Sequence, residues 1–156
     1  MRRAFVFLSL AVAACAAGAG TAEVRFVEPE KFSDAGFGAR EIGRTTDELA
    51  DHLKRLASRL PEGQTLKVEV LDVDLAGRVE HRATRDIRIL RGSADWPRIE
   101  LRYELVADGR TLKSGSEHLS SMNYLMDAGW PETQGSLSHE ERMLNRWFDQ
   151  TFGKAR

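Results

Sequence analysis

The chain has 156 residues, a formal net charge of −1, and 30% charged residues. This length is enough for one domain with one core and leaves little room for a second. Because the charges are mixed in sign and nearly balanced, the composition excludes the general electrostatic attraction to nucleic acid that a strongly basic protein has. Cys15 is the single cysteine, which excludes an intramolecular disulfide.

The first 22 residues have the order of a secretory signal peptide. Two arginines precede an apolar run from Ala4 to Ala14, which is too short for a membrane-spanning helix of ~20 residues. We expect signal peptidase to cut after Gly20-Thr21-Ala22, because small residues occupy the third and first positions before that bond. The product, residues 23–156, is then a single domain of 134 residues with a net charge of −3, and it is periplasmic or secreted.

A second processing route starts from Cys15. Val12-Ala13-Ala14-Cys15 is similar to the lipobox that precedes an acylated cysteine. Processing there would give a lipoprotein held on a membrane surface by Cys15, so the sequence leaves a soluble and a tethered product open.

The N-terminal part of the domain is predicted to hold a strand and an amphipathic helix. Alternating side chains favour a strand over residues 24–28, and residues 31–44 contain three glycines and are expected to form a loop. Thr45, with Glu48 three residues later, predicts the start of a helix by the capping-box pattern. The apolar stripe of this helix consists of Leu49, Leu53, Leu56 and Leu60.

Four further strands are predicted over residues 66–75, 86–90, 98–105 and 112–119. In the first of them the apolar side chains change parity after Val70. Either a bulge near Val70-Leu71 or burial of both faces would bring the two sets into one core. Asp108-Gly109 predicts a tight hairpin between the last two strands.

The C-terminal part is predicted to be a loop followed by a helix. Residues 121–137 are rich in loop signals, and Ser138 with Glu141 forms a second capping-box pattern. The apolar face of the final helix consists of Met143, Leu144, Trp147, Phe148 and Phe152. We therefore expect an α+β fold with a mostly antiparallel sheet of about five strands and two helices packed on one face.

Two carboxylates are candidates for chemistry. Asp72 and Asp74 are two residues apart and therefore share one face of a predicted strand, at a spacing that allows a shared cation or an acid–base pair. The alternative is that both cap a turn or form ion pairs with Arg78, Arg82 or Arg98. The four histidines are spread along the chain without metal-ligand spacing, so we expect no metal or cofactor.

A second group of candidates consists of aromatic and amide side chains in the loops. Trp96, Asn123, Tyr124 and Trp130 are typical of the lining of a small-molecule or peptide site. The alternative is that Tyr124 pins the 121–137 loop to the core while Asn123 bonds to the backbone.

Several segments together resemble a bacterial family of exported proteins known as domain of unknown function 3016. They include Asp72-Val73-Asp74-Leu75-Ala76-Gly77, Met122-Asn123-Tyr124-Leu125 and the closing residues 141–148. The resemblance covers nearly all of residues 24–152, and it implies export and a single domain but no reaction. The family pattern has Asp before Met-Asn-Tyr, where this chain has Ser121, so no acidic role can be transferred to that position.

Three functions are compatible with these features. The main hypothesis is a non-catalytic binding or accessory module of the periplasm or envelope, contacting an envelope protein, a peptide or a small molecule, because no nucleophile–base motif is visible. The first alternative is a metal-assisted hydrolase that uses Asp72, Asp74 and a histidine such as His81. The second is a structural lipoprotein that contacts the membrane through Cys15.

Overall fold

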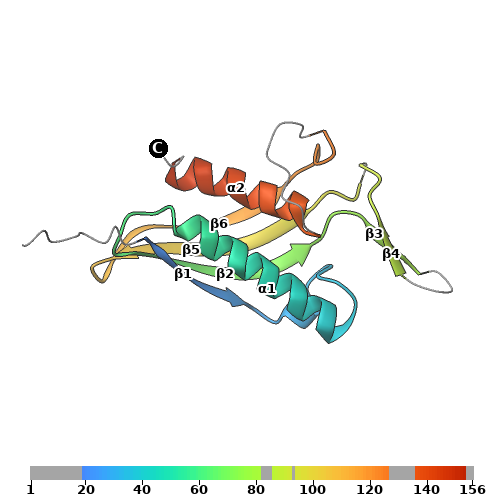
Figure 1. The fold of residues 1–156 in the computed structure, drawn as a ribbon, viewed down its shortest axis with the longest axis horizontal. Helices are drawn as coiled ribbons and strands as arrows, with labels where there is room; N and C mark the ends of the chain where they lie inside the picture. The colour runs from blue at the N-terminus through green and yellow to red at the C-terminus, as the bar shows by residue number, and fades with distance from the viewer. Residues whose placement is uncertain (1–18, 82–85, 93, 127–135, 154–156) are drawn as a thin grey trace, which may run out of the picture.

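The computed structural model describes residues 19–81, 86–92, 94–126 and 136–153. These residues form a four-stranded sheet with two helices on one face, and a two-stranded ribbon extends from one end (Figure 1). The elements in chain order are β1 (Thr21–Phe26), the 3-10 turn η1 (Pro29–Lys31), α1 (Gly38–Ala57), β2 (Gln64–Asp74), β3 (Arg78–His81), β4 (Asp86–Ile89), β5 (Arg98–Ala107), β6 (Arg110–Ser120) and α2 (Ser138–Phe152). The expected α+β class is confirmed.

The strand order of the main sheet is β1-β2-β5-β6. β2, β5 and β6 are antiparallel neighbours, whereas β1 is parallel to β2 from the Thr21–Thr65 pair to the Phe26–Val70 pair. The sheet is therefore mixed, and the expectation of a mostly antiparallel sheet is wrong. The reason is the crossover: α1 carries the chain back along the sheet, so β2 enters beside β1 in the same direction.

The expected number of strands is also corrected. The predicted strand at residues 86–90 does not join the main sheet, because β4 pairs only with β3, a strand that the sequence pattern did not reveal. The Asp108-Gly109 hairpin is confirmed, since both residues have positive φ angles, 50° and 71°, as a two-residue hairpin turn requires.

β2 contains the predicted bulge. Its pairing with β5 shifts register between Val70 and Asp72, so the parity of the strand changes at Leu71. As a result Val70 and Val73 are both buried, at 1% and 0% exposure. The core lies between this face of the sheet and the two helices.

The N-cap of α1 lies eight residues earlier than the sequence predicted. Phe37 is the N-cap residue, and the backbone N–H of Phe37 donates to the Glu41 carboxylate at 2.7 Å. Thr45 lies inside the helix and is buried, so the capping box predicted there is wrong. Ile42 lies one heptad before Leu49 and packs against the core, which continues the apolar stripe upstream.

α2 begins at Ser138, but the predicted capping box is wrong there as well, because the N-cap residue is Leu137 and no side chain caps the helix. The Glu141 carboxylate instead accepts a hydrogen bond from Arg55 of α1 at 3.1 Å. Beside this pair, His52 contacts Asn145 at 2.9 Å, and burial lowers the pKa of His52 below 6.5. Glu141 therefore helps to hold the two helices together.

Aromatic side chains fill the space between α2 and the sheet. The ring of Tyr103 meets the rings of Trp147 and Phe152 edge-on, with centroid distances of 5.5 and 5.6 Å. Neither helix of the described residues has the length and apolar run that a membrane crossing requires.

Two glycines allow a direct test of the fold. Gly77 has a φ angle of 84°, and a Cβ there would lie 2.6 Å from the carbonyl oxygen of Ile89, whereas a Cβ on Gly43 in α1 would have open space. We expect Gly77→Ala to lower the free energy of unfolding by about 1–3 kcal/mol through strain and clash. Gly43→Ala should raise it by about 0.5–1 kcal/mol, because alanine is the better helix former.

Urea denaturation measures both changes. A Gly77→Ala variant as stable as the wild-type protein would contradict the turn geometry described here.

Candidate functional site

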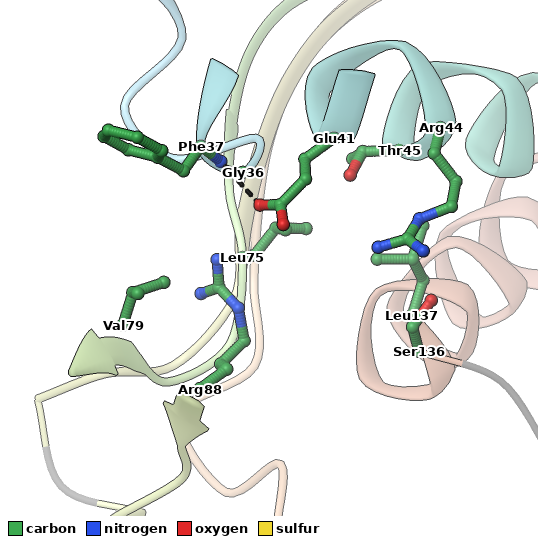
Figure 2. A pocket seen from close by; sticks show the side chains of 10 residues that line it. All are labelled: Gly36, Phe37, Glu41, Arg44, Thr45, Leu75, Val79, Arg88, Ser136 and Leu137. Atoms are coloured by element: carbon green, nitrogen blue, oxygen red, sulfur yellow. Dashed lines mark hydrogen bonds between the residues drawn. The ribbon is translucent and has the colours of Figure 1, made fainter. Parts of the chain in front are cut away.

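A pocket of about 280 Å³ lies where the start of α1, the end of β2, the ribbon and the residues before α2 meet (Figure 2). Figure 2 shows Glu41, Arg44 and Thr45 projecting from α1 on one side, and Arg88 reaching in from β4 on the other. The remaining lining residues are Gly36, Phe37, Leu75, Val79, Ser136 and Leu137. The pocket thus combines an apolar lining with charged groups, which is typical of ligand sites.

The charged groups of the pocket differ in whether they have hydrogen-bond or ion-pair partners within the protein. The Glu41 carboxylate accepts the Phe37 N–H, and Arg88 forms a two-pronged ion pair with Asp34 at 2.8 and 2.9 Å. Arg44 is exposed and has no hydrogen-bond or ion-pair partner among the residues that the structure describes. Arg44 is therefore the charge that remains available for a ligand.

A second hollow of about 250 Å³ adjoins the first. Both are lined by Leu75, Arg88 and Ser136, so the two hollows meet at these residues. The second extends along the start of α2, past His139 and Glu140. We call the two adjoining hollows together the depression.

The end of β2 holds the parts of this depression in place. The segment that enters α1 is fixed to it by backbone hydrogen bonds from Asp34 N to Val73 O at 2.8 Å and from Leu75 N to Asp34 O at 3.0 Å. Gly77 N donates to Asp95 O at 2.8 Å. We call residues 72–77, whose backbone forms these hydrogen bonds, the β2 hub.

Glu140 connects α2 to the β2 hub. Its side chain is 2% exposed, and its carboxylate accepts the Ala76 N–H at 2.7 Å. Burial is the main cause that raises the pKa of Glu140 above 4.5, while the Ala76 N–H and the charge of Arg88 act in the opposite direction. A buried acid with a raised pKa can mark a functional site, but this carboxylate already has a structural partner in the backbone.

The structure gives both predicted aspartates structural partners. The Asp72 carboxylate accepts hydrogen bonds from Ser33 N and Ser33 Oγ, each at 2.7 Å. Asp74 forms an ion pair with Arg98 at 2.5 Å, which was one of the alternatives that the sequence left open. Among the described residues no group of three or more His, Cys, Asp or Glu side chains could hold a metal ion.

The structure describes three of the four predicted loop residues, Trp96, Asn123 and Tyr124. Trp96 lies under the Arg98 guanidinium, 4.8 Å from the ring centroid, and Asn123 is exposed. Tyr124 is 1% exposed, its hydroxyl accepts the Gly92 N–H at 3.2 Å, and its ring meets His139 edge-on, so it pins the loop to the core. Trp130 and Cys15 lie outside the described residues. A binding role for any of these residues stays a prediction.

Ser121 lies directly before Met122-Asn123-Tyr124. It is buried, and its hydroxyl accepts a hydrogen bond from the Arg146 guanidinium at 2.7 Å. Ser121 therefore helps to hold this loop against α2.

Sequence reasoning missed the pocket residues Glu41, Arg44 and Arg88. The first two were assigned to a loop, although the apolar stripe through Ile42 indicates that the helix includes them. Arg88 alternates with two isoleucines in a strand pattern, and no local signal shows that it pairs with Asp34, which is 54 residues away.

Glu140 gives a pH-dependent prediction. Because its pKa is higher in the folded protein than in the unfolded chain, the folded protein binds this proton more tightly, and stability is lost as the pH rises from about 4.5 through the folded pKa. We expect Glu140→Gln to be at least as stable as the wild-type protein at pH 7, since the amide oxygen still accepts the Ala76 N–H. Glu140→Ala should lower the free energy of unfolding by about 1–3 kcal/mol, because that N–H loses its acceptor.

Urea titrations at pH 5 and pH 7 measure these differences. If Glu140→Gln lost as much stability as Glu140→Ala, the negative charge itself would be required, and the argument from burial would be wrong.

The chain was compared with known proteins. The family model "Protein of unknown function (DUF3016)" matches residues 20–150, from the start of β1 to the last turns of α2. No curated protein and no solved structure matches the chain. The family match confirms the resemblance seen in the sequence. Because it covers every strand and most of the chain, this protein belongs to the DUF3016 family of proteins of unknown function.

Proposed function

We propose that this protein is an exported, non-catalytic binding or accessory module of the cell envelope, with its ligand site in the pocket between α1 and the ribbon. The observation that carries the proposal is Arg44, an exposed cation without a partner among the described residues, which lines a partly apolar pocket of about 280 Å³. A charged group in this position is unused by the fold and available to a ligand.

The chemistry of the pocket favours an amphipathic ligand with an anionic group. The Arg44 guanidinium suits a carboxylate, which it can bind through two parallel N–H donors. Leu75, Val79 and Leu137 supply apolar lining to the same pocket. The second hollow adjoins the first and offers space for a further residue of a chain, so we propose a peptide that ends in, or carries, a carboxylate.

Export is supported by the sequence of residues 1–22 and remains part of the proposal. The order of a basic start, an apolar run and small residues is that of a signal peptide. A tether at Cys15 would place the same domain on a membrane surface without changing the pocket. Periplasmic, secreted and membrane-anchored forms are therefore distinguished by processing and not by the binding site.

Among the side chains that the structure describes, none specifically favours the hydrolase hypothesis. Asp72 and Asp74 are bonded to Ser33 and Arg98, as described above, and a catalytic role would require both to leave these partners. A reaction would also require a nucleophile or an activated water beside them. We therefore propose ligand binding, and not metal-assisted hydrolysis, as the function.

A matched pair of small probes tests the pocket. We expect N-acetyl-leucine to shift the backbone NMR signals of Arg44, Leu75 and Leu137 in a saturable way, and its uncharged methylamide to bind more weakly. Arg44→Ala should weaken binding of the acid by roughly tenfold, the usual value of one charge-assisted contact. Arg40→Ala is the control, because Arg40 is also exposed on α1 but does not line the pocket.

Equal weakening by the two substitutions would indicate a nonspecific charge effect and would contradict the proposed site. The same conclusion would follow if the acid and the methylamide bound equally well.

A further inference from the structure

Among the residues that the structure describes, Gly20 is the first with a hydrogen bond to the folded domain. The Gly20 N–H donates to the carbonyl oxygen of Leu60 at 3.0 Å. A Cβ on Gly20 would lie 2.7 Å from both the carbonyl oxygen of Ala57 and the Cβ of Leu60. Gly20 is thus packed tightly against the chain at the C-terminal end of α1, and only a glycine fits there.

The next two residues belong to β1. Thr21 pairs with Thr65 in the parallel register, and the two hydroxyls are 3.0 Å apart. Ala22 pairs with Leu66 and packs against the core. The signal-peptide cut after Ala22 that we expected from the sequence would therefore remove two of the six residues of an edge strand, together with the packed glycine.

A cut three residues earlier would remove none of these contacts. Ala17-Gly18-Ala19 places small residues at the third and first positions before Gly20, which meets the requirement of signal peptidase as well as Gly20-Thr21-Ala22 does. We propose that the leader is removed between Ala19 and Gly20 and that Gly20 is the N-terminal residue of the mature protein. This inference rests on the exported location that the proposed function includes.

The chemistry of the cut supports this position. Hydrolysis by one water molecule leaves the carboxylate of Ala19 on the released leader and a protonated α-amino group on Gly20. This ammonium group replaces the amide N–H that donates to Leu60 O, just beyond the C-terminal end of α1 (Gly38–Ala57). A positive charge is favourable at a helix C-terminus, where the partial charge of the helix dipole is negative.

The intact mass of the native product tests the inference. The full chain, including residues 1–22, is expressed in a bacterial host and recovered from the periplasmic and membrane fractions. We expect the mass of the chain that begins at Gly20. A chain beginning at Glu23, or at an acylated Cys15, would overturn the cut after Ala19 while leaving export supported. An uncleaved chain in the cytoplasm would overturn export itself and the cut with it.

Two substitutions separate the two possible cuts. Ala19→Leu places a large residue directly before the proposed bond, so we expect the Gly20 product to disappear. Ala22→Leu places the same side chain before the other bond and should leave the Gly20 product in place. Because the mass records cleavage and not folding, the comparison holds even if Ala22→Leu weakens the packing of β1. The opposite pattern would overturn the inference.

Discussion

The end of β2 is the constraint on which the rest of the structure depends. The bulge at Leu71 turns Val73 into the core, and the next four residues then form bonds to three different parts of the chain. Leu75 binds the segment before α1, Ala76 binds Glu140 of α2, and Asp74 and Gly77 bind Arg98 and Asp95 at the start of β5. These three parts are far apart in sequence, so the β2 hub joins separate elements into one scaffold.

The candidate site is a consequence of this arrangement. The pocket lies where the elements joined at the hub meet, and Arg88, which is paired with Asp34, lines both the pocket and the adjoining hollow. Most charged groups near the hub are used to hold the fold, which is why Asp72 and Asp74 make poor candidates for chemistry in spite of their spacing. Arg44 differs because the fold does not use it, and a group of that kind is the better indication of a ligand.

The parts of the fold that follow from local periodicity could be predicted, and the parts that depend on pairing could not. The change of parity in β2 predicted its bulge, and the leucine stripe predicted the main part of α1. The parallel pairing of β1 was missed because alternation within a strand does not identify its neighbour. The start of α1 was missed because Gly38 and Gly43 resemble loop residues, and this error concealed Glu41 and Arg44. The pairing of Arg88 with Asp34 has no local signal at all.

Amide hydrogen exchange of the native protein tests the role of the β2 hub most directly. If the β2 hub holds the elements of the fold together, its hydrogen bonds open only when the whole domain unfolds. The N–H groups of Asp34, Leu75, Ala76 and Gly77 should then exchange as slowly as those between β2 and β5. Exchange at these four positions as fast as in the exposed Asp108-Gly109 turn would contradict the account. The hub would then open independently, and the pocket would lack the rigid frame proposed for it.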